Sequence, residues 1–414
     1  MYPLIAMALA LTLLIVLLRL KVRLGRSMLL SSVGLAILLG VTPSELWQTV
    51  VYEWYNSPLS QTAGYLFITL TALVILVNVL GVAMKETGVS DQLVPALQGL
   101  FRSRRLALSA IPLMMGMLPT PGGIMLSAPM VRDLGDRFGM DRTRLAAINF
   151  FFRHQWESVW PLFPAVPLIQ SMFGISAFVL ISHNIAITLF GMLGGVIFLL
   201  SSSMPARNHE SQSKGRFSAN LRGFIHAFWP IALVATLYAA VDLPPSIGVL
   251  LAIFIFLVLH KVPLNRWETI FKKGLEIDFA LLVLGALLFK LNLEAGQAIP
   301  AVVNFLSDIN MSKYFVIFFL PLLVAFLTGV TMPTVAITFP FLMPLIGSGQ
   351  QTKVAFETLA FSGLICGLLL TPVHLCLALS ASYFEAPLIR IVLKLLGPVV
   401  FVASAGLLMA VFFG

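Results

Sequence analysis

The sequence predicts an all-α membrane protein with about ten transmembrane helices and two re-entrant helical hairpins, arranged as two inverted-topology repeats. Composition is the first reason: of 414 residues, 59% are hydrophobic and only 10% are charged, whereas soluble domains carry about 25% charged residues. The second reason is that apolar stretches of helix length recur along the chain. The third is that the two halves of the chain share an order of prolines and interruptions. The solvent of this chain is therefore lipid.

About ten apolar stretches have the length of a transmembrane helix. They cover residues 1–18, 28–43, 63–84, 145–170, 177–200, 225–241, 246–260, 279–293, 358–383 and 388–413. Two further apolar stretches, 106–131 and 314–346, are interrupted near their middle by Pro and small polar residues. Because a broken backbone at membrane depth is tolerated only inside protein or beside a water-filled cavity, both are expected to be re-entrant hairpins.

Charge predicts the orientation in the membrane. The first apolar stretch has no basic residues before it and no signal-peptide cleavage pattern, so it is expected to be a span with its N-terminus outside. In that orientation, most of the 26 Lys and Arg residues fall in cytoplasmic segments, and only Lys313 and Lys353 fall outside. The expected location is the inner membrane, with both termini on the periplasmic side.

The two halves resemble each other. Residues 1–200 form the first predicted repeat, 201–224 a cytoplasmic linker, and 225–414 the second repeat. The matched positions are Pro95 with Pro300, Pro112 with Pro321, Pro119 with Pro333, and His154 with His374. Because each half holds an odd number of spans, the second repeat must be inverted. Inverted repeats with discontinuous helices are the architecture of many secondary transporters.

The two hairpin tips are the first candidate binding site. Proline ends a helix and glycine permits unusual backbone shapes, so each tip leaves a half-helix whose N-terminus favours an anion. The candidate substrate-binding residues are Pro119, Thr120, Pro121, Gly122 and Gly123 at the first tip and Thr331, Met332, Pro333 and Thr334 at the second. Thr338 is a candidate for ion coupling. The alternative is a pair of structural kinks whose Thr hydroxyls bond their own backbone.

Charged and titratable side chains within the spans are the second candidate site. Arg153 and Glu157 lie four residues apart, on one helix face. The planar guanidinium suits a carboxylate or phosphate, and His154, Glu157 and His374 would take part in ion coupling. The alternative is a self-neutralised pair, with His374 making a helix-to-helix hydrogen bond. Lys290, near the end of its span, is expected to extend toward the membrane surface.

Other classes of function lack support in the sequence. No catalytic motif is present, and Cys366 and Cys376 have no metal-ligand spacing, so they are interpreted as core residues and neither a catalytic residue nor a metal site is predicted. The basic residues are scattered through short loops, which argues against nucleic-acid binding. An intramembrane enzyme is therefore disfavoured, while a channel or efflux pump of the same architecture stays the alternative to a carrier.

Three segments carry a resemblance to a known family. MLPTPGGIMLSAPM (117–130), FFRHQWESVWPLFPA (151–165) and LLLTPVHLCLALSASYF (368–384) resemble an uncharacterised prokaryotic family of ten-span membrane proteins, domain of unknown function family 401. That family is grouped in the ion transporter superfamily with gluconate, citrate, dicarboxylate and arsenite carriers. The resemblance implies a scaffold domain, a mobile domain that carries both hairpin tips, elevator motion and a homodimer.

One departure from the superfamily bears on the substrate. Its dicarboxylate carriers have Ser-Asn-Thr motifs at both tips, whereas this chain has Pro-Thr-Pro-Gly-Gly and Met-Pro-Thr. The resemblance therefore leaves open the dicarboxylate substrate and the sodium ion. The sequence predicts a secondary active carrier of a small organic anion, a carboxylate first, driven by Na⁺ or H⁺, with no cofactor other than Na⁺ as a candidate coupling ion.

Overall fold

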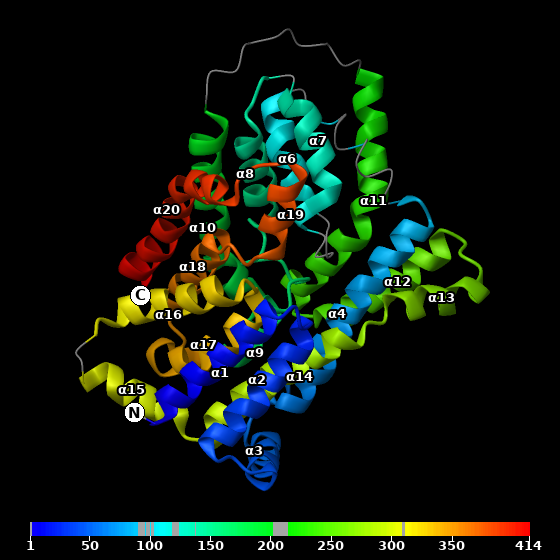
Figure 1. The fold of residues 1–414 in the computed structure, drawn as a ribbon. Helices are drawn as coiled ribbons and strands as arrows, with labels where there is room; N and C mark the ends of the chain where they lie inside the picture. Colours follow the sequence, from blue (N-terminus) through cyan, green and yellow to red (C-terminus); the bar gives the residue numbers. More distant parts are fainter. Residues whose placement is uncertain are drawn as a thin grey trace.

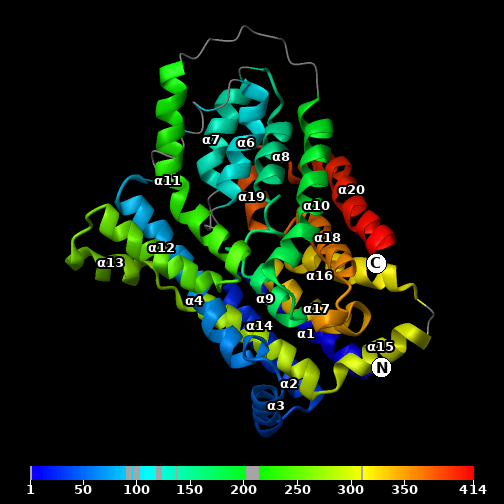
Figure 2. The same ribbon diagram turned by 180° about the vertical axis from the view of Figure 1, so that it is seen from behind.

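The computed structural model describes residues 2–89, 96, 100, 103–117, 124–136, 138–201, 214–308 and 311–414. Throughout these residues the regular structure is helical, without a β-strand, which confirms the all-α class. Figures 1 and 2 show the helices from opposite sides.

The helices before the linker are the following: α1 (Tyr2–Arg19), α2 (Leu24–Leu39), α3 (Pro43–Asn56), α4 (Ala63–Glu86), α6 (Arg104–Gly116), α7 (Ile124–Asp136), α8 (Arg142–Arg153), α9 (Ala165–Phe173) and α10 (Ala177–Gly195), which continues as the π-helical turn η2 (Val196–Leu200). A short 3-10 turn, η1 (Leu59–Gln61), precedes α4.

The helices after the linker follow a similar order. They are α11 (Lys214–Val241), α12 (Pro245–Leu259), α13 (Leu264–Gly274), α14 (Ile277–Ala295), α15 (Ala298–Asp308), α16 (Lys313–Thr328), α17 (Thr331–Ile346), α18 (Val354–Leu370), α19 (Leu375–Tyr383) and α20 (Leu388–Phe413), with the 3-10 turn η3 (Gly349–Gln351) before α18. Thus α2–α3–α4 corresponds in order to α12–α13–α14, and α6 to α10 corresponds to α16 to α20. The inverted topology itself stays a prediction.

The described helices include six that are long and apolar enough to cross a membrane, or up to seven if the bent pair α2–α3 counts as one span. Shorter apolar helices, such as α12, α16 and α17, accompany them. This is the architecture of a multi-pass membrane protein. Fewer than the ten predicted spans are counted among the described helices because the stretch 145–170 is divided by a helix break and because helices such as α2 and α12 are shorter than 18 residues.

Two predicted spans are broken. The stretch 145–170 consists of α8 and α9, separated by irregular backbone from His154 to Pro164. The stretch 358–383 consists of α18 and α19, separated at 371–374. Proline lacks the N–H that a continuing helix needs, and both breaks contain proline: Pro161 and Pro164 in the first, and Pro372 in the second. These segments are therefore discontinuous helices rather than kinked spans.

Residues 44–62, between the predicted spans 28–43 and 63–84, are largely helical. Thr42 caps α3 through its hydroxyl, Pro43 occupies the first turn, and Glu45 completes a capping box. The axis of α3 departs from that of α2 by 106°. Trp47 and Tyr55 are exposed on it, as expected for a helix lying at a membrane surface, where aromatic side chains are enriched.

The helices form two packed sets. In one, α2 packs against α14 and α1, and α4 packs against α12, α13 and α14. In the other, α18 packs against α16 and α20, α20 against α10, and α8 against α6, α7 and α19. Figure 1 shows the second set above the first, with α1, α2 and α14 running diagonally beneath it. The sets meet where α14 contacts α17 and where α1 contacts α16.

Small residues allow close helix packing in the second set. Gly363 and Gly367 lie one turn apart on α18, and a Cβ at either position would come within 2.1 Å of a carbonyl oxygen on α16. This spacing of small residues is a common way for membrane helices to bring their backbones together. The contact fixes α18, and therefore the break that follows it, against the hairpin formed by α16 and α17.

Candidate functional site

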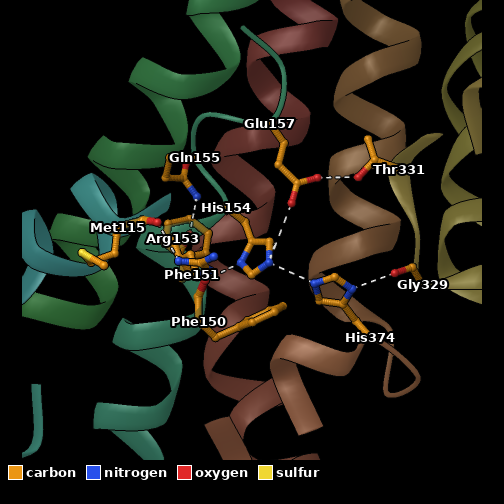
Figure 3. Close-up of polar contacts among 10 residues, drawn as sticks. All are labelled: Met115, Phe150, Phe151, Arg153, His154, Gln155, Glu157, Gly329, Thr331 and His374. Atoms are coloured by element: carbon orange, nitrogen blue, oxygen red, sulfur yellow. Dashed lines mark hydrogen bonds and ion pairs between the residues drawn. The ribbon is translucent and has the colours of Figure 1, made fainter. Parts of the chain in front are cut away.

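A cavity of about 740 Å³ lies where both helix breaks meet the turn between α16 and α17. One wall is the C-terminal end of α1 and the residues after it, including Arg19 and Lys21. The other walls carry polar side chains from distant parts of the chain, several of which Figure 3 draws. Those polar residues are Arg153, His154, Glu157, Thr328, Thr331, His374 and Cys376.

Arg153 is the last residue of α8 and is only 6% exposed. Its Nη1 donates a hydrogen bond of 2.7 Å to the carbonyl oxygen of Met115 at the end of α6. Gly116 follows, and a Cβ there would lie 2.0 Å from the Arg153 carbonyl oxygen. The close approach therefore requires glycine. Arg153 also interacts electrostatically with Cys376 and Glu157, so this guanidinium connects the first hairpin to both breaks.

The two histidines contact each other at the cavity wall. His154 Nε2 lies 2.9 Å from His374 Nε2. The other ring nitrogen of each histidine contacts a backbone carbonyl: His154 Nδ1 is 2.6 Å from the oxygen of Phe150, and His374 Nδ1 is 2.6 Å from the oxygen of Gly329. Figure 3 shows this chain of contacts running from α8 through both rings to the second hairpin. Residues 220 positions apart in sequence thus form one pair.

Glu157 completes the polar cluster. Its Oε1 lies 3.7 Å from His154 Nε2, and its Oε2 accepts a hydrogen bond from the Thr331 hydroxyl. The side chain is buried. Burial of a carboxyl is costly without hydrogen-bond or charge partners, and here the partners come from α17 and the first break. Glu157 therefore links the second hairpin to the break that follows α8.

Two helix N-termini reach the same cavity. Val330 precedes α17 and His374 precedes α19, and neither side chain caps the helix that follows it. The first-turn N–H groups of a helix have no partner within the helix, and the helix dipole places partial positive charge there. Together with Arg153, these ends make the surroundings of the cavity positive, which favours an anionic ligand.

The predicted site residues divide into three groups. The structure brings together Arg153, His154, Glu157, Thr331 and His374. Pro119, Thr120, Pro121, Gly122 and Gly123 lie outside the described residues. Met332, Pro333, Thr334 and Thr338 are buried in α17 and are not among the described residues that line the cavity.

The Thr residues inside α17 bond their own helix. The Thr334 hydroxyl donates to the Val330 carbonyl at 2.7 Å and lies 3.1 Å from the Thr328 hydroxyl. The Thr338 hydroxyl donates to the Thr334 carbonyl at 2.8 Å. This is the alternative that the sequence left open for the tip. Only Thr331, at the first position of the helix, turns its hydroxyl toward Glu157.

Among the described cavity residues that sequence reasoning missed, three are ionisable. Cys376, interpreted as a core residue, lies in the first turn of α19 beside the histidines. Arg19 and Lys21, used only to orient the chain, line the wall formed by the end of α1. A cysteine two residues after His374 was the available signal, but the expected continuous helix placed Cys376 on a different face.

A further buried carboxyl was also missed. Glu357 is fully buried in the first turn of α18, where Asn184 Nδ2 donates to its Oε1 at 3.3 Å. The predicted span began at residue 358, which left Glu357 at its end. The helix instead begins at Val354. An ionisable residue buried at membrane depth is a functional candidate by default, although Glu357 is not among the residues lining the cavity.

The comparison with protein families agrees with the resemblance carried by the motifs. The family model described as protein of unknown function (DUF401) matches residues 4–412. The chain therefore belongs to this family over nearly its whole length. No curated protein matches the chain.

Proposed function

We propose that this protein is a secondary active transporter of a small organic anion, most simply a carboxylate, coupled to Na⁺ or H⁺. The cavity at the two helix breaks is the observation that carries the proposal. Its volume of about 740 Å³ falls in the range of small-molecule sites. Secondary transporters often bind their substrate in a central cavity that discontinuous helices line.

The charges around the cavity support an anion as the substrate. Arg153 brings a guanidinium that stays charged in proteins, and Arg19 and Lys21 add positive charge on the α1 wall. The N-termini of α17 and α19 add the partial charge of two helix dipoles. Glu157 supplies one negative group, so the described ionisable groups on these walls are predominantly cationic.

The packing of the helices supports an elevator motion. The cavity lies between α1, which belongs to the first packed set, and the breaks and hairpin of the second set. A sliding movement of the second set along α1 and α14 would carry the breaks with it, because α16, α18 and α20 pack together. We place the protein in the inner membrane with both termini outside, as a homodimer.

Transport into proteoliposomes tests the proposal. The purified full-length protein is reconstituted, and uptake of radiolabelled mono-, di- and tricarboxylates is measured under an imposed sodium or pH gradient. A carrier gives saturable uptake and accelerated exchange when unlabelled substrate is present on the opposite side. The gradient that drives accumulation identifies the coupling ion.

The same preparation separates the alternatives. Current without counterflow would favour a channel of this architecture over a carrier. An efflux pump would be favoured if proteins inserted in one orientation move the substrate only from the cytoplasmic to the outer side. The driving ion gradient would then run in the opposite direction. If no anion is transported while cations or neutral solutes are, the anion proposal is wrong.

A further inference from the structure

We propose that His154, His374 and Cys376 form a binding site for a divalent transition-metal ion of the Zn²⁺ class. One ring nitrogen of each histidine and the Cys376 Sγ atom all lie within 4.8 Å of one another. They come from both helix breaks and share one wall region of the cavity. Imidazole nitrogen and thiolate sulfur are the donors that Zn²⁺ takes most often in proteins.

The hydrogen bonds of the histidines favour a bound cation. A carbonyl oxygen only accepts hydrogen bonds, so the Nδ1 atoms facing Phe150 and Gly329 each carry a hydrogen. In the neutral rings both Nε2 atoms then bear lone pairs, and these atoms face each other at 2.9 Å. Two lone pairs at this distance repel each other unless a proton on one ring or a bound metal cation lies between or beside them.

The same hydrogen bonds hold the rings as metal ligands are held. A histidine that binds a metal through one nitrogen usually donates its other N–H to a carbonyl or carboxylate, which fixes the tautomer and the ring orientation. Both His154 and His374 have such a carbonyl partner. The two supporting carbonyls belong to different elements, the end of α8 and the end of α16, so the site also joins these elements.

The distances suit coordination after small side-chain movements. With about 2.0–2.1 Å to nitrogen and about 2.3 Å to sulfur, the ligand atoms of a tetrahedral zinc ion lie roughly 3.3–3.7 Å apart. The nitrogens must separate slightly from 2.9 Å, and the sulfur must approach from within 4.8 Å. Glu157 offers a fourth donor, since its Oε1 is already 3.7 Å from His154 Nε2.

The local charges are compatible with a divalent ion. Cysteine binds metal as the thiolate, so a thiolate and the Glu157 carboxylate together balance the two positive charges of the ion, and Arg153 stays as a positive group that an anionic ligand can meet. Arg153 interacts electrostatically with both Cys376 and Glu157. No single segment carries the three ligands at a usual spacing, which is why the sequence predicts no metal. The site does not depend on the transport proposal.

Cobalt binding to the intact protein is the test. Full-length protein in detergent is treated with a chelator and titrated with Co²⁺, which takes the Zn²⁺ position and gives visible bands and a thiolate-to-cobalt charge-transfer band. We expect one Co²⁺ per chain, complete displacement by Zn²⁺, and X-ray absorption that reports both nitrogen and sulfur ligands. The absorption measurement uses the unmodified chain and so does not depend on a variant that folds.

Variants assign the ligands. Cys376→Ser should abolish the charge-transfer band and weaken Co²⁺ binding about tenfold or more, and His374→Ala should weaken it at least as much. Cys366→Ser is the matched control, because Cys366 is buried in α18 against the Val399 carbonyl of α20. The Cys366→Ser protein should bind cobalt like the wild type. No saturable binding by the wild-type protein, absence of sulfur in its absorption spectrum, or an unchanged spectrum in Cys376→Ser would each overturn the metal site.

Discussion

Two groups of ionisable side chains are buried in this protein, and their partners differ. Lys290 on α14 lies 2.7 Å from a Glu53 oxygen and 3.0 Å from a Glu294 oxygen. Glu53 also accepts the backbone N–H of Ala63 at 3.0 Å. Lys290 is the shared positive partner of both carboxylates, and the group ties α3 and the start of α4 to α14.

The cavity group is arranged otherwise. His154 and His374 face each other through nitrogens that lack a matching donor, and Arg153 and Glu157 stand beside a cavity that both helix breaks line. A buried charge at membrane depth therefore does not by itself mark a site. The distinguishing feature is the presence, beside a cavity, of side-chain atoms that could bind a ligand and have no matching partner within the protein.

Removing the cation of the Lys290 group should give the largest effect on stability. Lys290→Met leaves the buried Glu53 and the partly exposed Glu294 without their positive partner, and breaking a buried ion pair in this way costs about 3–5 kcal/mol. We expect a marked fall in the midpoint of thermal unfolding in detergent. Lys272→Met is the control, because Lys272 pairs with Glu268 on the surface and such pairs contribute about 0–1 kcal/mol. Equal effects of both substitutions would remove the distinction between the two kinds of pair.

Arg153→Lys should act mainly on ligand binding. An ammonium reproduces the charge but not the planar fork of the guanidinium, and loss of a hydrogen bond to a charged group costs about 1.5–3 kcal/mol. We expect affinity for an organic anion to fall about tenfold to a hundredfold in a binding titration. Arg142→Lys, at an exposed position paired with Asp136, should bind as the wild type does. An Arg153→Lys protein with wild-type affinity would make Arg153 a structural connection only.

Gly116→Ala tests how closely α6 must approach the first break. The added Cβ would lie 2.0 Å from the Arg153 carbonyl oxygen, so the backbone has to shift, at an overpacking cost of about 1–3 kcal/mol. Both thermal stability and anion affinity should fall. Gly64→Ala in α4 serves as the control, since a Cβ there meets no atom within 4 Å. Anion affinity that survives Gly116→Ala would separate the first hairpin from the site.

Thr338→Val should have the smallest effect of all. The Thr338 hydroxyl bonds the carbonyl of its own helix and does not line the cavity, so we expect unchanged anion affinity and unchanged dependence on the coupling ion in the transport assay. Thr331→Val, which removes the hydrogen bond to Glu157, is the informative partner. A coupling defect in Thr338→Val would place the ion deeper in α17 than the cavity does.

Much of the fold could be predicted because it follows from local properties. Mean hydropathy of +0.98 requires a lipid environment. There the backbone N–H and C=O groups must find hydrogen-bond partners within the protein, and a helix supplies them within one segment. Prolines and glycines marked the interruption between α16 and α17 near residues 329–333, while the first tip, at 119–123, lies outside the described residues. Prolines also marked the break after α8, where the stretch from His154 to Pro164 forms turns instead of a continuous helix. The capping box of Thr42 and Glu45, a local signal as well, was passed over at the end of the predicted span 28–43.

The sequence by itself determined the membrane class, the helical interruptions, and the candidates Arg153, His154, Glu157 and His374. Only the tertiary structure decided which of them meet, because contacts between residues 220 and 237 positions apart depend on how helices pack. Lys290, expected to extend toward the membrane surface, instead donates a hydrogen bond to Glu53 on α3. The same packing placed Cys376 beside the histidines. The hydroxyls of Thr334 and Thr338 bond carbonyls of their own helix, because a break changes the direction in which every later side chain points.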